Sequence, residues 1–301
     1  MKRNKTMMVC FLGPAVLSYL TVFLYPTLRT GLMSLFNVGN ITDPITKWTF
    51  VGVANYQLLF SESLFIASLK NIAGIWFWGG IGIFFVSILF ASILTSGVRY
   101  KSFFRAVVYL PNVISAVAMG TMWIHYVYNA KYGLFRSLFA SLHLEGLAGI
   151  QWTAPDMIFT SLIIAYSFGM VGYFMLIFMA GIEKIPADYF EAATLEGANS
   201  WRKFRSITFP LLKDIIRTNI VLWSINVVGF FVWSQIFSPL TPEMGTVSPM
   251  VYMYQTVFGG STVVIDRNVG AGASVGVVLT LIVIFSFLIT NVIFKAERLE
   301  Y

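Results

Sequence analysis

The sequence is poor in charged residues, since only 11% of its 301 residues are Asp, Glu, Lys or Arg. Soluble domains carry about 25% charged residues, and a soluble chain of this length could not cover its surface with so few. Hydrophobic residues make up 57% of the chain. The composition therefore excludes an ordinary soluble protein and predicts an all-α membrane protein with several spans.

The sequence also lacks motifs for ATP binding and for a zinc-dependent hydrolase. No G-x-x-x-x-G-K-[ST] motif occurs and the dipeptide Gly-Lys is absent, so we expect that this chain does not bind ATP itself. His125 and His143 are isolated from any cluster of potential metal ligands, and the single Cys10 excludes an internal disulfide. The motif H-E-x-x-H is absent as well. Nothing predicts a catalytic site, a bound cofactor or a bound metal.

Six segments are free of charged residues and long enough to cross a membrane, which takes about 20 mostly apolar residues. They are Thr6–Leu28, Asn71–Val98, Ala106–Ala130, Met157–Ile182, Thr218–Pro242 and Asn268–Phe294. A seventh uncharged segment, Met244–Ile265, is continuously apolar only from about Pro249 to Phe258. That part is short for a span and fits an interfacial or re-entrant helix. We predict six transmembrane helices in one domain over residues 1–301, with an uncleaved first helix.

The cations are distributed unevenly along the chain. The net charge of +7 would suit a nucleic-acid or acidic-lipid partner, but the pattern indicates membrane topology instead. If the N-terminus is cytoplasmic, 14 of the 20 Lys and Arg residues fall on the cytoplasmic side. A seventh span would move Lys295 and Arg298 outside and weaken this bias. We predict both termini in the cytoplasm, membrane lipid as the surroundings and no nucleic-acid partner.

The most charged stretch of the chain lies between the fourth and fifth apolar segments. Pro186 can open a short helix there, and Gly197 can end that helix in a left-handed conformation. Asn199 or Ser200 can cap a second helix that runs to about Ile207. In the predicted topology, this helix–turn–helix faces the cytoplasm.

A set of residues in this stretch resembles the EAA loop, which marks the membrane subunits of ATP-binding-cassette (ABC) importers. The matching positions are Glu191, Ala192, Ala193, Gly197, Ile207 and Pro210. Phe209 stands where the family usually has Leu. The flanking IPADYF and PLL resemble the carbohydrate branch of the family, of the maltose-permease type, and weaker similarity runs from about Phe11 to Phe294. The alternative is an amphipathic loop whose charges merely face water.

The resemblance implies the type I ABC importer permease architecture, with about residues 183–213 as a cytoplasmic coupling loop. Its six matching positions would attach the chain to an ATPase. The implied partners are a second homologous permease, two ATPase subunits that bind ATP with magnesium, and an extracytoplasmic sugar-binding protein. The implied location is the plasma (inner) membrane of a bacterium or archaeon. The chain itself would be a non-catalytic subunit of a sugar importer, with an oligosaccharide as the expected cargo.

The fifth apolar segment carries a polar and aromatic stripe. Its members are spaced four and three apart, which places them on one helix face: Asn219, Trp223, Asn226, Phe230 and Trp233. Rings can stack on a sugar while amides bond its hydroxyls, so the stripe predicts a sugar path. The alternative is a seam between helices, held by asparagine.

The fourth segment offers a further candidate for the sugar path. Tyr173 stands eighteen positions before Glu191, where the maltose type has a sugar-contacting Tyr. The Asn-rich patch of that type is matched only by Asn226, so the resemblance does not carry maltose specificity to this chain. The path candidates are Tyr173, Trp223, Asn226 and Phe230.

Two rival functions remain open from the sequence. A self-contained secondary transporter or channel would need a coupling residue or a filter within the membrane, and the six segments contain no charged residue. A scaffold or assembly factor would transport nothing and would bind no ATPase. The sequence does not reveal which sugar is carried, its length, or whether the host has an outer membrane.

Overall fold

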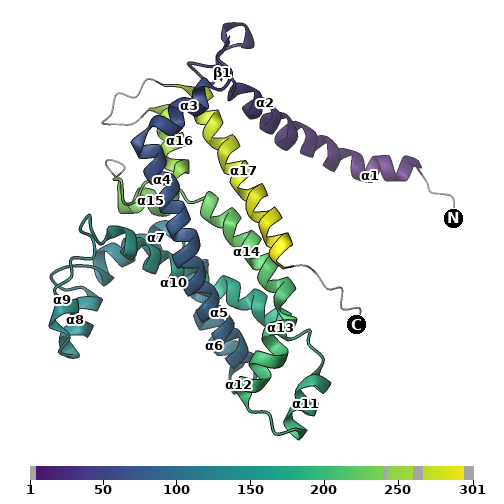
Figure 1. The fold of residues 1–301 in the computed structure, drawn as a ribbon, viewed down its shortest axis with the longest axis vertical. Helices are drawn as coiled ribbons and strands as arrows, with labels where there is room; N and C mark the ends of the chain where they lie inside the picture. The colour runs from purple at the N-terminus through teal and green to yellow at the C-terminus, as the bar shows by residue number, and fades with distance from the viewer. Residues whose placement is uncertain (1–4, 240–242, 260–266, 295–301) are drawn as a thin grey trace. The chain divides into compact units, whose positions relative to one another are not determined.

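The computed structural model describes residues 5–239, 243–259 and 267–294, and these are mainly helical (Figure 1). The α-helices before the charged stretch are α1 (Lys5–Ser18), α2 (Tyr25–Met33), α3 (Ala54–Ser61), α4 (Ser63–Gly74), α5 (Gly80–Thr95), α6 (Lys101–Val113), α7 (Ala116–Met122), α8 (Leu134–Ser141), α9 (Glu145–Ala148) and α10 (Ile158–Ile182). Those that follow are α11 (Ala187–Leu195), α12 (Ser200–Lys203), α13 (Phe209–Leu211), α14 (Lys213–Val228), α15 (Val232–Phe237), α16 (Pro249–Phe258) and α17 (Val269–Ile293).

Shorter elements connect these helices. The π-helical segments are η1 (Tyr19–Leu24), η3 (Ile75–Gly79), η4 (Trp123–Val127) and η5 (Phe204–Thr208), and η2 (Ile45–Lys47) is a 3₁₀ turn. The strands β1 (Phe36–Asn37) and β2 (Thr49–Phe50) form an antiparallel pair in which Phe36 lies opposite Phe50. The cations Lys2, Arg3, Lys295 and Arg298 and the end of the seventh uncharged segment lie outside the described residues.

Four continuous helical stretches are long and apolar enough to cross a membrane. They are Val9–Met33, Ser63–Thr95, Ile158–Ile182 and Val269–Ile293, and they correspond to the first, second, fourth and sixth predicted segments. The seventh uncharged segment contains α16, a ten-residue helix over the apolar part predicted from the sequence. The described residues therefore include several candidate membrane spans, although not all six predicted segments are single helices.

The third predicted segment differs from a straight span. The predicted segment Ala106–Ala130 overlaps the helix pair Lys101–Val113 and Ala116–Val127, and the two helices of this pair are bent by 95°. Pro111 lies in the last turn of α6, and Ile114 leaves the helical conformation directly after it. Ser115 then caps α7, because its side chain accepts a hydrogen bond from the Ala118 N–H. A proline near a helix end and a new cap favour such a break.

The fifth predicted segment is also interrupted. α14 ends at Val228, and α15 resumes only at Val232 after a break at Gly229–Phe231. With 16 residues, α14 is short for a span of about 20 residues. Gly229 is the residue that ends α14, a position where glycine is favoured, so the predicted segment Thr218–Pro242 is not one continuous helix.

The chain forms two compact units. The first comprises residues 1–66 and 252–281, and the second comprises residues 67–251 and 282–301. In the first unit, the buried Asn55 side chain donates hydrogen bonds of 2.9 Å to the carbonyl oxygens of Ser34 and Phe36. This amide ties α3 to the chain entering the β1–β2 hairpin, beside a small cluster of Met33, Val38, Val269 and Ala273.

The core of the second unit is built around α10. About half of the residues of α10 are buried, and Phe174, Met175 and Phe178 are fully buried. The ring of Phe84 in α5 meets Phe174 edge-on at 5.1 Å, and Gly172 lies directly against the α6 backbone at Val108. Lipid is as apolar as these side chains, so close packing rather than removal from water holds the helices together.

Candidate functional site

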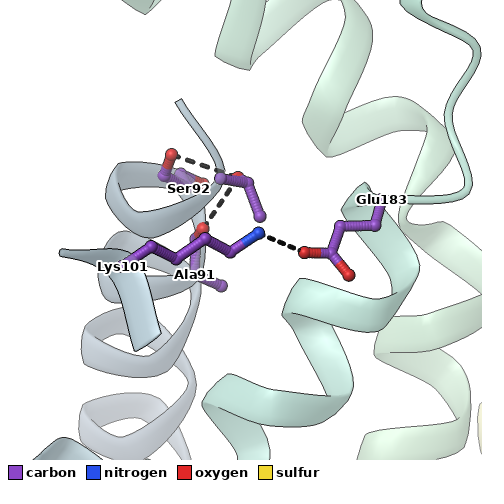
Figure 2. Close-up of polar contacts among 5 residues, drawn as sticks. Ala91, Ser92, Lys101 and Glu183 are labelled. Atoms are coloured by element: carbon purple, nitrogen blue, oxygen red, sulfur yellow. Dashed lines mark hydrogen bonds and ion pairs between the residues drawn. The ribbon is translucent and has the colours of Figure 1, made fainter. Parts of the chain in front are cut away.

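The charged stretch begins where α10 ends. Glu183 caps the C-terminus of α10, and its carboxylate pairs with the Lys101 ammonium group at the start of α6 (Figure 2). Both side chains are partly exposed, so water screens the pair and its net stabilisation is small. Its geometric effect is to join the start of α6 to the base of the charged stretch.

The first helix of the stretch, α11, ends in a glycine turn. Gly197 has a φ of +74°, as predicted from the sequence. The Ala198 N–H bonds the Ala193 carbonyl at 2.8 Å, and the Gly197 N–H bonds the Thr194 carbonyl at 3.0 Å. These two bonds form a Schellman motif, which satisfies the last carbonyls of the helix and needs a left-handed residue at Gly197. A Cβ at Gly197 would meet nothing within 4 Å, so its requirement is one of backbone conformation alone.

The second helix of the stretch starts at Asn199, also as predicted. The Asn199 side chain accepts a hydrogen bond of 2.8 Å from the Arg202 N–H and caps α12. The helix continues as η5 to Thr208. The Lys203 ammonium group donates a 2.7 Å hydrogen bond to the Thr194 hydroxyl, which joins the two short helices across the turn. The local helix–turn–helix prediction is confirmed.

The predicted coupling residues share this motif but differ in exposure. Glu191 and Ala192 on α11 and Gly197 in the turn are exposed, whereas Ala193, Ile207 and Pro210 are half-buried. No ion pair of Glu191 occurs among the described residues. The exposed carboxylate and the small side chain beside it are therefore available to another subunit.

The predicted path residues fall into two groups. Trp223 and Phe230 are buried, at 1% and 3% exposure. The Trp223 indole N–H donates a 2.8 Å hydrogen bond to the Trp76 carbonyl, and its ring stacks on Tyr166 at 5.7 Å. Phe230 meets Tyr166 edge-on at 4.8 Å. Trp223 and Phe230 therefore lie in a seam between helices, which was the alternative to a sugar path.

Tyr173 and Asn226 form the second group, because both are only half-buried. The Asn226 amide donates a 2.8 Å hydrogen bond to the Leu222 carbonyl in its own helix, which leaves capacity on the amide for a ligand. The Tyr173 ring touches Phe174 edge-on at 5.0 Å. These two residues remain accessible in the single chain.

An apolar groove of about 560 Å³ lies in the second unit, lined by parts of α4, α14 and α17. The hydroxyl groups in its wall bond within the protein: Ser224 accepts from the Trp76 indole at 2.8 Å and lies 2.7 Å from the Ser286 hydroxyl. A groove whose polar groups are already paired offers little to a sugar. Among the described residues, no group of three His, Cys, Asp or Glu side chains could hold a metal.

Comparison with known proteins establishes the family. The sequence profile of the binding-protein-dependent transport system inner membrane component matches residues 83–298, which is most of the chain. The chain belongs to this family. The permease is 30% identical over 276 residues to a probable ABC transporter permease protein of Pyrococcus horikoshii, covering 88% of this chain and 91% of that one. The family resemblance seen in the sequence is thus confirmed.

Two further similarities concern the relatives' cargo and the fold. The permease is 28% identical to a probable starch degradation products transport system permease protein of Thermoanaerobacterium thermosulfurigenes, over 85% of each chain. It superimposes with a TM-score of 0.75 on a chain from a bacterial ABC transporter involved in the import of the acidic polysaccharide alginate. That match covers 97% of the permease and 98% of the other chain at 21% identity, and it shows that the fold is shared.

Three features of the charged stretch escaped the sequence analysis. Leu195 at the end of α11 is 91% exposed, and Trp201 at the start of α12 is 67% exposed. Both flank the Gly197 turn, and large apolar side chains at a predicted soluble turn were the signal that could have found them. The third feature, the Lys101–Glu183 pair, joins residues 82 apart in the sequence, so no local pattern reveals it.

Proposed function

We propose that the permease is one of two membrane subunits of an ATP-driven oligosaccharide importer, coupled to its ATPases through α11 and α12. The observation that carries this proposal is the exposed helix–turn–helix, which presents Glu191, Leu195 and Trp201 to solvent at the end of the central helix α10. Exposed tryptophan and leucine side chains beside the Gly197 turn do not stabilise an isolated subunit. They are typical of a surface that binds another protein.

Each part of this surface suits contact with an ATPase subunit. The Leu195 and Trp201 side chains can enter an apolar groove on the partner and anchor the contact. Glu191 can meet a basic residue, and Ala192 allows close approach of the α11 backbone. Movement of the ATPases would then displace α11 and α12 and, through them, the helices on either side.

The remaining parts of the proposal concern assembly and cargo. Six spans with both termini in the cytoplasm would follow if the bent pair α6–α7 and the broken pair α14–α15 each cross once. A second permease, two ATPases that bind ATP with magnesium and an outer sugar-binding protein complete the importer in the plasma membrane of a bacterium or archaeon. The starch-product relative supports a sugar as cargo. We place Tyr173 and Asn226 on its path because both side chains are only half-buried.

The coupling claim can be tested with a matched pair of glycine variants. Gly197→Ala forces a Cβ into a left-handed backbone at a cost of roughly 1–2 kcal/mol. Gly82→Ala is the control, because Gly82 lies inside α5 and has a helical backbone that alanine adopts without strain. Its added Cβ also meets nothing within 4 Å. With the partner permease and ATPases co-expressed, we expect Gly197→Ala to lower both ATPase recovery and uptake several-fold, and Gly82→Ala to leave both unchanged.

A charge reversal provides the second arm of the test. Glu191→Arg should reduce ATPase recovery, because it repels the basic partner proposed for this exposed carboxylate. Recovery of the partner permease should stay normal in every variant, since none of the three positions is buried in the bundle. Normal ATPase recovery and normal uptake in both Gly197→Ala and Glu191→Arg would disprove coupling through this stretch.

A further inference from the structure

One buried asparagine of α14 differs from the other polar residues of that helix. Asn219 is 0% exposed, and neither its amide nitrogen nor its amide oxygen has a hydrogen-bond partner among the residues that the structure describes. Polar neighbours along the helix are satisfied, since Trp223 bonds the Trp76 carbonyl and Asn226 bonds the Leu222 carbonyl. An amide buried without any partner is unfavourable, and native proteins keep few such groups.

The contacts of neighbouring residues locate Asn219 in the seam between α14 and α10. Four residues earlier, Ile215 packs on Gly181, where an added Cβ would lie 2.8 Å from Ile215 Cγ1. Four residues later, Trp223 meets Phe174 with ring centroids 6.0 Å apart. Asn219 lies midway on the same helix face. The level of α10 between these contacts includes Met175 and Phe178, which are apolar and fully buried.

The helix that carries this amide is bounded at both ends. A turn at Leu212 separates α13 from α14, and the break at Gly229–Phe231 separates α14 from α15. Opposite Trp223, the chain of η3 is π-helical, and such segments depart from regular helix packing. α14 is therefore one continuous helix between two interruptions, and it follows directly on the charged stretch.

We propose that Asn219 is a positioning residue that destabilises the α10–α14 seam seen here and so lets α14 shift against α10 during the transport cycle. In the shifted arrangement, the amide gains hydrogen-bond partners that it lacks in this one. The unpaired amide thus brings the two arrangements closer in free energy, which a transporter that alternates between them requires. This inference rests on the proposed coupling, because α14 is one of the two helices beside the charged stretch that movement of the ATPases would displace.

The test replaces the amide with an apolar side chain of similar size. Asn219→Leu, measured in the assembled transporter, should raise the thermal midpoint by roughly 2–4 °C. The same variant should lower ATP-driven uptake roughly five-fold or more, because it stabilises one arrangement over the other. ATPase recovery should not change, since Asn219 lies outside the docking surface. Asn219→Met, with an unbranched and adaptable side chain, should act in the same way if leucine does not fit.

A bonded asparagine serves as the matched control. The Asn71 amide donates hydrogen bonds of 2.8 and 2.9 Å to the carbonyl oxygens of Met244 and Val247. Asn71→Leu leaves both carbonyls unpaired, so it should lower the thermal midpoint where Asn219→Leu raises it. Uptake at the wild-type rate, or a lower midpoint, in both Asn219→Leu and Asn219→Met would overturn the inference. Failure of the proposed function would look different, because the wild-type transporter itself would then show no ATP-driven uptake.

Discussion

Trp223 and Asn226 lie three residues apart on α14, yet their surroundings give them different roles. Trp223 is enclosed by Tyr166, Phe174, Gly79 and Gly80, and its indole N–H is paired. A fully buried ring of this kind stabilises the seam between helices and offers no free face to a ligand. The half-buried Asn226 retains a partly accessible amide. Burial thus separates residues that helical spacing alone had grouped together.

This difference predicts two different phenotypes among three alanine variants. Tyr173→Ala and Asn226→Ala should each reduce sugar uptake several-fold with normal ATPase recovery, because a lost hydrogen bond is worth roughly 0.5–1.5 kcal/mol. Trp223→Ala should instead lower the yield of folded permease, since truncating a buried Trp costs roughly 3–5 kcal/mol. Uptake and size-exclusion yield measured on the same preparations separate the two effects. Normal uptake in both of the first two variants would remove Tyr173 and Asn226 from the path.

The helices of the second unit meet through glycines at defined points. A Cβ at Gly172 of α10 would overlap the α6 backbone at Val108 and Tyr109, so the two helices touch there without any side chain between them. At Gly169, one turn earlier, a Cβ would lie 3.8 Å from the Trp233 ring, which is ordinary contact. Close approach of helix backbones is a common way to associate in lipid, where small residues favour packing.

These two glycines provide a test of helix packing at adjacent turns of α10. Gly172→Ala should sharply reduce the thermal midpoint or the yield of folded permease, because the α6 backbone cannot move aside as a flexible side chain can. Gly169→Ala should be close to neutral. Thermal unfolding of the two purified variants measures the difference. Equal midpoints would show that α6 and α10 do not approach each other as described.

At the level of the whole chain, the distribution of cations predicts the orientation in the membrane. The stretch that carries α11 and α12 holds six of the 20 Lys and Arg residues, which is typical of a cytoplasmic segment. That orientation is also the one that gives a cytoplasmic ATPase access to the proposed docking surface. The orientation is thus a prediction that the charges of the sequence make.

Reporter fusions test this orientation directly. A fusion after Lys184 and a fusion after Arg298 should both report the cytoplasm, and a fusion after Lys131 should report the outside, because the two sides alternate across six spans. An external signal at Lys184 would contradict both the topology and the proposed coupling. An external signal at Arg298 alone would indicate an additional crossing near α16.

The sequence by itself determined the class of this protein and the local form of its charged stretch. Uncharged segments of about 20 residues have few stable states other than a helix in lipid, and the Gly197 turn and the Asn199 cap depend only on neighbouring residues. Only the tertiary structure decided which stripe residues are enclosed and which amide has no hydrogen-bond partner among the described residues. These outcomes depend on contacts between segments far apart in the chain. Helical periodicity places Asn219, Trp223 and Asn226 on one face, but it does not say what that face meets.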